Sequence, residues 1–301
     1  MMRDISSAQS LADCEDQPFT VTSNSQMYHH KDRQKVFKLW DQQREVDMMI
    51  AAGDCSVQPL ERVFFSAGAG DPERLFGFTM KAETPLDMKK IDPARKQAYA
   101  NDMIACVQSL HSKGIVHGDI KPANMLLCSD GKIRLCDFAE SRLLTEDPAE
   151  WGGQTTLNYC SPHRCQQLGS GYGDDLFPAP VVEDDLFALG LSIWELWKGE
   201  VPFVDDYCDD IYHLIQLGKT VDVELIEDEE VRKMIWVYLK LGGATGIATE
   251  QDFEAVQALP PADTYSRMLS SKDLVLLGEG EAPVPPTTGI ERNFAPPSPL
   301  N

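Results

Sequence analysis

One short stretch of the sequence constrains the fold more than any other. Residues 117–124 read HGDIKPAN, and Asp137 follows thirteen residues after Asn124. Two β-type runs, NMLLC and KIRLCDF, lie in this interval and flank Asp130-Gly131, a pair typical of tight hairpin turns. A hairpin here returns the chain, so that Asn124 and Asp137 can meet at one site. The sequence therefore predicts a loop and a hairpin that bring two carboxylates, a lysine and an amide together.

This set of side chains suits the transfer of a phosphoryl group. Such a reaction needs a carboxylate that orients the attacking hydroxyl, hard oxygen ligands for Mg²⁺, and a cation that faces the developing negative charge. Asp119, Asn124 and Asp137 supply the oxygens, and Lys121 supplies the cation. The alternative is that these residues only form turns, but their joint spacing favours the catalytic interpretation.

At these residues the sequence resembles the eukaryotic protein kinase family, over about residues 30–245. Lys121-Pro122 after Asp119 is similar to the Ser/Thr branch, and the HGD segment resembles short non-RD fungal protein kinases. The resemblance implies that Asp119 is the catalytic base and that Lys121 contacts the γ-phosphate. It implies further that Asn124 and Asp137 are the Mg²⁺ ligands.

Other segments carry the same resemblance. Residues 156–162, TLNYCSP, resemble the end of an activation segment, in which Thr156 would line the substrate hydroxyl site. Asp185 starts an apolar helical run and would hold the backbone of the catalytic loop. We expect His117 to support that loop by packing, with no acid or base role.

The resemblance also extends upstream of the catalytic loop. Lys38 ends a β-type run as the ATP-binding lysine does, and Glu45 on the next helix is its expected partner. That helix is predicted over residues 41–52, with Asp41 as its N-cap and Gly53 after its end. Met80 would be the gatekeeper, and Lys81 to Glu83 would be the hinge that binds the nucleotide.

These features predict an α+β, two-lobed protein-kinase-like fold. Its N-terminal, β-rich lobe is reduced, and its C-terminal lobe is larger and mainly helical. We expect a flexible N-terminus over 1–17, the N-lobe over 18–84, the C-lobe over 85–245, and a Pro-rich, disordered tail over 246–301.

The sequence departs from the kinase pattern at several positions. The first glycine is Gly53, so the G-x-G-x-x-G loop that covers the ATP phosphates is absent. Either residues 18–37 form a reduced hairpin without glycine, or the first strands are missing. The interval from Lys38 to Glu45 is also shorter than in the family, which places Glu45 in the first turn of its helix.

Three further departures concern the lower part of the site. Gly118 replaces the arginine that meets an activation-loop phosphate, so we expect no switch of that kind. Ala139 replaces the glycine after Asp137-Phe138 and should leave metal binding intact. His163 replaces a glutamate whose usual arginine partner we also do not find, so both members of that pair are expected to be lost together.

The amino-acid composition limits the classes of partner that the protein is expected to bind. The chain has 48 Asp and Glu against 27 Lys and Arg, a formal net charge of -21, which argues against nucleic acid or an anionic membrane. The longest apolar stretch, 186–197, is too short to cross a bilayer. The eight cysteines contain no C-x-x-C pair, and no signal peptide is predicted. We expect a monomer with reduced thiols in the cytoplasm or the nucleus.

The sequence therefore predicts a serine/threonine protein kinase that transfers the γ-phosphate of ATP to a protein substrate with Mg²⁺. One alternative is a weak or inactive pseudokinase that acts as a binding module, because the glycine loop is absent. The other is a small-molecule phosphotransferase similar to aminoglycoside kinases, against which residues 156–162 argue.

Overall fold

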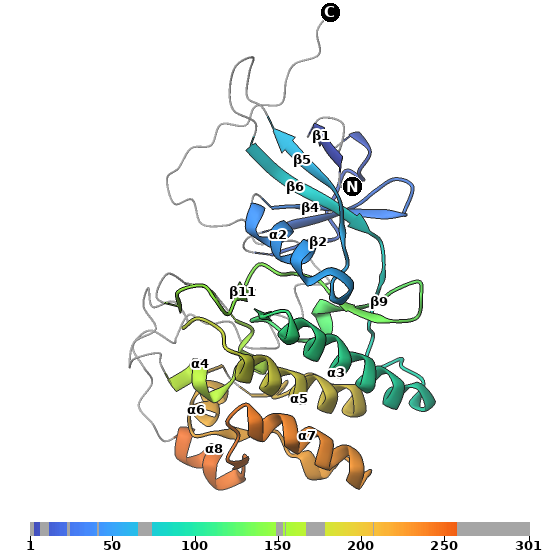
Figure 1. The fold of residues 1–301 in the computed structure, drawn as a ribbon. Coiled ribbons are helices and arrows are strands. Elements are labelled where there is room, and N and C mark those ends of the chain that lie inside the picture. Colours follow the sequence, from blue (N-terminus) through green and yellow to red (C-terminus); the bar gives the residue numbers. More distant parts are fainter. Residues whose placement is uncertain are drawn as a thin grey trace, which may run out of the picture.

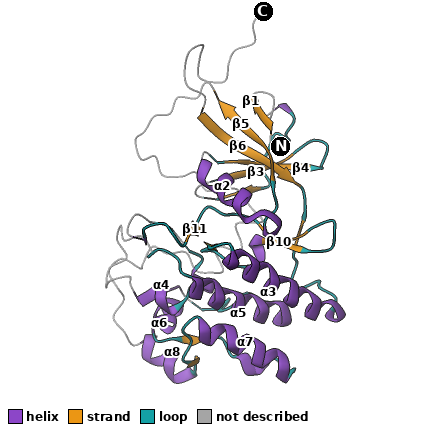
Figure 2. Cartoon of the chain, viewed as in Figure 1, coloured by secondary structure: helices purple, strands orange, loops and turns teal. Residues whose placement is uncertain are grey.

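The computed structural model describes residues 3–6, 12–22, 25–40, 42–65, 74–148, 153, 155–166, 178–206 and 208–257. A twisted sheet with one helix forms the upper lobe, and a group of helices forms the lower lobe (Figures 1 and 2). This is the two-lobed α+β fold that the sequence predicts.

The upper lobe is a six-stranded sheet with the order β1-β5-β6-β4-β3-β2. Strand β1 pairs in parallel with β5, and the other neighbours are antiparallel. The strands are β1 (Arg3–Ser6), β2 (Thr20–Val21), β3 (Gln26–His29), β4 (Lys35–Leu39), β5 (Pro59–Phe65) and β6 (Arg74–Lys81).

Helix α2 (Gln43–Ala52) covers one face of this sheet (Figure 1). Val46 and Met49 lie three positions apart on its buried side and belong to the same core cluster as Phe78 of β6. The helix ends at Gly53, whose positive φ of 57° suits a residue without a Cβ atom. Asp41, the expected N-cap, lies outside the described residues, and Gln42 takes the cap position.

The region that lacks glycines forms a hairpin, as the first of the two alternatives for the missing loop expects. Thr20 pairs with Met27, and Val21 pairs with Gln26. The turn is closed by a hydrogen bond from the Thr22 amide to the Ser25 carbonyl (2.9 Å). A reduced hairpin therefore stands in the place of the glycine-rich loop.

The lower lobe is built around helix α5, which lies between α3 and α7 (Figure 1). Nearly all side chains of α5 from Asp184 to Leu196 are buried, as its apolar sequence predicts. The main helices are α3 (Lys96–Ser112), α4 (Pro162–Gln166), α5 (Val182–Lys198), α6 (Cys208–Gln216), α7 (Glu229–Leu241) and α8 (Glu250–Gln257).

Short strands and single helical turns connect these helices. The strands are β7 (Thr84–Pro85), β8 (Ile115–Val116), β9 (Met125–Leu127), β10 (Ile133–Leu135), β11 (Arg142–Leu143), β12 (Lys219–Thr220) and β13 (Gly246–Ile247). The 3₁₀ turns are Gly53–Cys55, Pro93–Arg95, Pro122–Asn124, Leu157–Tyr159 and Val223–Leu225. Strands β9 and β10 form the predicted hairpin on either side of Asp130-Gly131.

Both ends of the described chain differ from the expectation of unstructured segments. Residues 3–6 form strand β1, where Ile5 packs near the buried Cys14 and Phe37. Residues 246–257 form β13 and α8, and the rest of the predicted tail lies outside the described residues. The apolar positions in these two segments are too few to stand out from the polar residues around them in the sequence.

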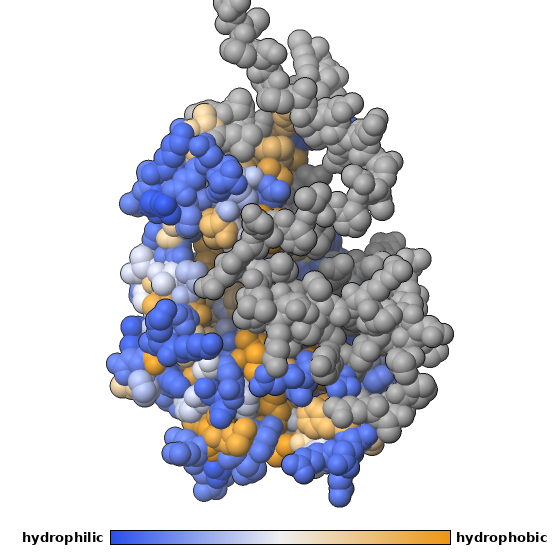
Figure 3. All heavy atoms as spheres, turned by 180° about the vertical axis from the view of Figure 1, so that it is seen from behind, coloured by the Kyte–Doolittle hydropathy of each residue, from blue (hydrophilic) through white to orange (hydrophobic). Residues whose placement is uncertain are grey.

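On the face that Figure 3 shows, the coloured part of the surface is mostly hydrophilic, and apolar side chains are exposed in the lower lobe. Exposed large apolar residues of that lobe include Leu217, Leu225, Val237 and Leu241. Within the described ranges, every helix is too short or too polar to span a bilayer.

Candidate active site

A cleft of about 190 Å³ lies between the two lobes. The upper lobe lines it with Thr22, Ser25, Lys38 and Trp40. The lower lobe lines it with residues of the catalytic loop, of the segment after β10 and of the later activation segment, namely Asp119, Lys121, Asp137, Ala139, Glu140, Thr155 and Thr156. Residues from distant parts of the sequence therefore converge on one space.

Lys38 connects the two lobes at the back of this cleft. Its Nζ atom lies 2.8 Å and 3.1 Å from the two carboxylate oxygens of Glu45 and 2.7 Å from Oδ1 of Asp137. The short interval between Lys38 and Glu45 does not prevent the contact, because Lys38 is the next-to-last residue of β4 and Glu45 lies in the first turn of α2. The structure thus brings together the three residues that the sequence pointed to.

Burial and charge compete within this group. Burial alone would lower the pKa of Lys38, but Glu45 and Asp137 outweigh it and hold that pKa above its ordinary value. Burial raises the pKa of Glu45 to about 7, against the opposing effect of Lys38. The raised pKa of Lys38 favours a charged Lys38–Glu45 ion pair, whereas the raised pKa of Glu45 favours a protonated, neutral Glu45. With Lys38 in contact with both oxygens, the geometry favours the ion pair, and Glu45 is the member whose charge depends on pH.

The carboxylate of Asp119 is the centre of the lower half of the site. Lys121 donates from Nζ to Asp119 Oδ2 (2.6 Å), and Thr156 donates from Oγ1 to Asp119 Oδ1 (2.8 Å). Asn124 donates from Nδ2 to the carbonyl and to Oδ2 of Asp119 (2.9 Å and 3.0 Å). Burial would raise the pKa of Asp119, but Lys121 outweighs this effect and holds the pKa below its ordinary value. Asp119 is therefore an ionised acceptor.

The backbone of the catalytic loop is fixed from below by Asp185. This residue accepts hydrogen bonds from the amides of His117 (2.8 Å) and Gly118 (2.9 Å). His111 lies 2.8 Å from the same carboxylate through Nε2, a contact that the sequence did not predict. His117 itself is fully buried, lies edge-on against Phe138 and contacts the Cys136 carbonyl at 3.1 Å. Its position suits the packing role expected of it.

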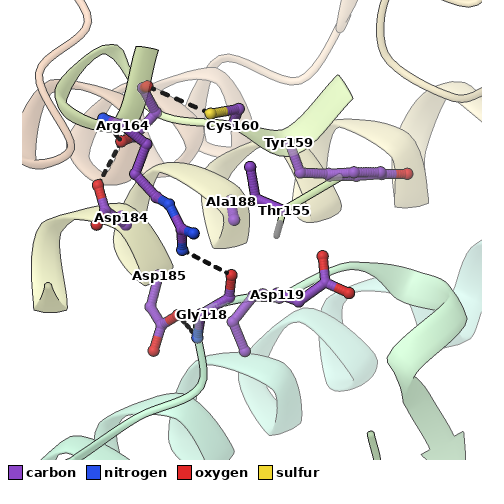
Figure 4. Close-up of a pocket in the computed structure, with 11 residues that line it drawn as sticks. Gly118, Asp119, Thr155, Tyr159, Cys160, Arg164, Asp184, Asp185 and Ala188 are labelled. Atoms are coloured by element: carbon purple, nitrogen blue, oxygen red, sulfur yellow. Dashed lines mark hydrogen bonds between the residues drawn. The ribbon is translucent and has the colours of Figure 1, made fainter. Parts of the chain in front are cut away.

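A second contact to the loop comes from Arg164, which lines a small cavity beside it (Figure 4). Arg164 is almost fully buried and donates from Nη1 to the Gly118 carbonyl (3.2 Å). Sequence reasoning missed this residue, because its partner is a carbonyl group 46 positions away.

His163 has a carboxylate partner in place of the lost arginine. Its Nδ1 atom lies 3.1 Å from Oδ1 of Asp184, and this hydrogen bond raises the pKa of His163. Asp184 also accepts from the Ser161 hydroxyl and from the Val181 amide. The end of the activation segment is thus joined to the start of α5 by a different pair from the one common in the family.

Two oxygens of the site fit a divalent cation. Both N–H groups of Asn124 are directed to Asp119, which leaves Asn124 Oδ1 as an acceptor. Asp137 has a positive φ of 63°, lines the cleft, and has a side chain that is 42% exposed. Among the described residues no group of three His, Cys, Asp or Glu side chains could hold a metal. An ion held by Asn124 and Asp137 therefore has to complete its shell with water and phosphate oxygens, as Mg²⁺ does.

The predicted hinge residues lie outside the lining of the cleft. Glu83 accepts a hydrogen bond from the Ser129 amide (3.0 Å), and Lys81 contacts both Glu83 (3.0 Å) and the Ser129 hydroxyl (2.5 Å). These side chains connect the hinge to the β9–β10 hairpin, so the structure does not bring them to the other site residues. Met80, the expected gatekeeper, is buried at the end of β6.

Comparison with known proteins identifies the family. The protein kinase domain model matches residues 75–253, more than half of the 301 residues. The chain belongs to the protein kinase family. It is 35% identical over 137 residues to the human cAMP-dependent protein kinase catalytic subunit PRKX, a match that covers 46% of this chain and 35% of PRKX.

Two further relatives of this kinase carry serine/threonine-protein kinase names. The kinase sck2 of Schizosaccharomyces pombe is 28% identical over 188 residues, which covers 60% of this chain and 27% of sck2. The kinase RUNKEL of Arabidopsis thaliana is 39% identical over 108 residues, 35% of this chain and 7% of RUNKEL. The matched part of this chain thus spans about a third of PRKX and less of the other two.

Proposed function

We propose that the protein transfers the γ-phosphate of ATP to serine or threonine hydroxyls of a protein substrate, with Mg²⁺ as its metal ion. One observation carries the proposal: the Lys38–Asp137 pair and the Asp119–Lys121 pair face a single cleft. The first pair offers a cation for phosphate oxygens and a ligand for a metal. The second offers a base for an attacking hydroxyl and a second cation.

The attacking hydroxyl would be oriented by Asp119. Thr156 Oγ1 already lies 2.8 Å from Asp119 Oδ1, so an alcohol fits beside this carboxylate. As the substrate oxygen attacks the γ-phosphorus, its proton passes to Asp119, the bond from that phosphorus to the β,γ-bridging oxygen breaks, and ADP leaves. Lys121 Nζ lies 2.6 Å from both Asp119 Oδ2 and Thr156 Oγ1, where its charge faces the transferred group.

The triphosphate of ATP would be held by Lys38 at the back of the cleft and by the hairpin of the upper lobe. Lys38 is fixed by Glu45 and Asp137 with its Nζ atom toward the cleft. Thr22 and Ser25 line the upper side, where other kinases place glycines. When bound, Mg²⁺ neutralises phosphate charge, and Asn124 and Asp137 are the residues that would hold it.

The two observations that motivated the pseudokinase alternative carry less weight in the structure. The missing glycine loop is replaced by a hairpin that reaches the cleft, and the short interval from Lys38 to Glu45 still gives a close ion pair. The described residues retain a base, two lysines and two candidate metal ligands. An active enzyme therefore explains more of the site than a binding module does.

The test combines nucleotide binding with phosphate transfer. Calorimetry would measure Mg²⁺-ATP binding, and transfer to a generic basic protein would be followed alongside. We expect Asp119→Asn to bind nucleotide but transfer about 10²- to 10⁴-fold more slowly, as loss of a general base does. Asp137→Asn should lose transfer and bind Mg²⁺-ATP more weakly. Wild-type protein that binds no nucleotide would contradict the proposal.

A further inference from the structure

Helix α2 contacts the lower lobe through Arg44, the residue just before Glu45. Arg44 donates from Nη1 to Oε1 of Glu146 (2.8 Å) and from Nη2 to Oε2 (2.5 Å), 102 positions along the chain. Nη2 also donates to the carbonyl of Ser141 (3.2 Å). Two parallel N–H···O bonds between a guanidinium and a carboxylate fix orientation as well as distance. The position of α2 is therefore linked to the segment that follows Asp137.

The Glu146 end of this contact is itself fixed. Its Oε2 atom accepts from the Leu143 amide (2.9 Å), and its carbonyl accepts from Arg142 Nη1 (3.1 Å). Arg142 and Leu143 form β11, which pairs with β8 immediately before the catalytic loop. The hydrogen bond from Arg44 is the main cause of the lowered pKa of Glu146, so this carboxylate stays charged. Glu146 is thus a charged group fixed to the base of the site.

The structure also leaves no room for the arginine that usually orders this segment. Gly118 has a φ of 82°, and a Cβ atom there would lie 2.5 Å from the Glu140 carbonyl oxygen and 3.0 Å from Cγ of Pro180. A longer side chain at this position would have to displace both neighbours. The catalytic loop therefore cannot carry a cation at position 118 that recruits a phosphorylated segment.

We propose that the Arg44–Glu146 pair is the positioning device that holds α2 where Glu45 meets Lys38. The carboxylate of Glu146 takes the place of a phosphate group in the activation segment, and activity requires no phosphorylation of that segment. This inference rests on the proposed kinase function. Arg44 and Glu146 act through Glu45 and Lys38, and neither touches the reacting atoms.

The first experiment is a double-mutant cycle in phosphate-free protein. Wild type, Arg44→Gln, Glu146→Gln and the double variant are treated with phosphatase, and intact mass confirms that no phosphate remains. The side chain of Arg44 is 39% exposed and that of Glu146 is 33% exposed. Solvent screens a pair that is exposed to this extent, so the expected effect on kcat is moderate. We expect each single variant to lower kcat about three- to tenfold, with little change in KM for the protein substrate. The double variant should be no slower than either single variant.

The matched control is the exposed pair Glu229–Lys233 on α7, with an N···O distance of 2.8 Å. The same cycle of substitutions to glutamine there should leave kcat unchanged. If Glu146→Gln behaves like Glu229→Gln, the inference is wrong. It is also wrong if phosphate-free wild type is inactive and phosphorylation of the activation segment restores activity.

The second experiment does not depend on activity. Hydrogen–deuterium exchange is followed at the amides of residues 43–52 in full-length wild type, Glu146→Gln and Glu229→Gln. Faster exchange of α2 only in Glu146→Gln, about three- to tenfold, supports the inference. Equal exchange in all three proteins overturns it. If no form of the protein transfers phosphate, the proposed function fails, and this measurement alone decides whether Glu146 holds α2.

Discussion

Thr156 donates a hydrogen bond from its Oγ1 atom to Asp119 Oδ1 over 2.8 Å. The same hydroxyl accepts from Lys121 Nζ at 2.6 Å, so one threonine links Asp119, the proposed base, to Lys121. Thr156 comes from the end of the activation segment, and Asp119 comes from the catalytic loop. The contact makes the position of the base depend on the position of the segment that would bind a protein substrate.

Replacement of Thr156 should therefore affect catalysis more than stability. Thr156→Val keeps the shape of the side chain and removes the hydroxyl, which breaks both contacts. We expect kcat to fall about 10- to 100-fold, because Asp119 and Lys121 lose the hydroxyl that holds them in position. Thr156→Ser keeps the hydroxyl and should retain most activity. Equal rates for the two variants would contradict this role.

Replacement of Lys38 should lower the stability of the folded protein by an amount that depends on pH. In Lys38→Met the buried carboxylate of Glu45 loses its cation, which raises a pKa that is already about 7. Glu45 then binds its proton more tightly in the folded variant than in the unfolded chain. The stability of the variant therefore falls as the pH rises above the pKa of Glu45 in the unfolded chain. Urea unfolding should show a larger loss relative to wild type at pH 8 than at pH 5.

The double variant Lys38→Met/Glu45→Gln is the control for this prediction. Glutamine cannot ionise, so the extra loss at high pH should disappear. Breaking a buried pair by removing one partner costs about 3–5 kcal/mol, and this sets the upper limit for the single variant at pH 8. A loss of equal size at both pH values would show that Glu45 does not carry the effect.

Glu195 should give a separate pH dependence. This residue of α5 is buried and accepts a hydrogen bond from the Tyr159 hydroxyl. Burial raises the pKa of Glu195 to about 7. The folded state therefore binds a proton that the unfolded state has released, and stability falls as pH rises from about 4.5 to about 7.

Glu195→Gln should remove this dependence and keep the contact with Tyr159. We expect the melting temperature of the variant to exceed that of wild type at pH 8 and the difference to shrink at pH 5. A shift of about two and a half pKa units corresponds to roughly 3 kcal/mol at most. Parallel pH profiles for the two proteins would rule out an uncharged Glu195.

Two glycines with nearly the same backbone angle allow a comparison of strain with crowding. Gly118 and Gly131 have φ values of 82° and 83°, but a Cβ atom at Gly131 meets nothing within 4 Å. Gly131→Ala should cost about 1 kcal/mol for its left-handed backbone. Gly118→Ala adds a contact of 2.5 Å with a backbone oxygen and should cost about 1–3 kcal/mol more. Similar unfolding free energies would refute the close packing around Gly118.

Much of the fold and of the site could be predicted because the relevant residues are close in sequence. The HGDIKPAN loop and its hairpin span about twenty residues, and turn chemistry fixes the return of the chain. The contact of Lys38 with Glu45 follows from a strand that leads directly into a helix. In each case a local pattern determines which side chains face one another.

The contacts that escaped prediction join distant segments through single side chains. His111 meets Asp185 across 74 positions, and Arg44 meets Glu146 across 102 positions. Each residue is an ordinary polar member of its own segment, and only the packing of the lobes gives it a partner. The hinge over Lys81 to Glu83 stays a prediction, and the contact of the Lys81 side chain with Ser129 exists only because the β9–β10 hairpin lies beside it.

The crowding at Gly118 has a consequence for how this protein can change in evolution. A single substitution to arginine would place a side chain where Glu140 and Pro180 already lie. Those neighbours would have to move first, and their movement brings no benefit until the arginine is present. Control of this loop by a phosphate would therefore require several coordinated changes, and a single substitution at position 118 would not supply it.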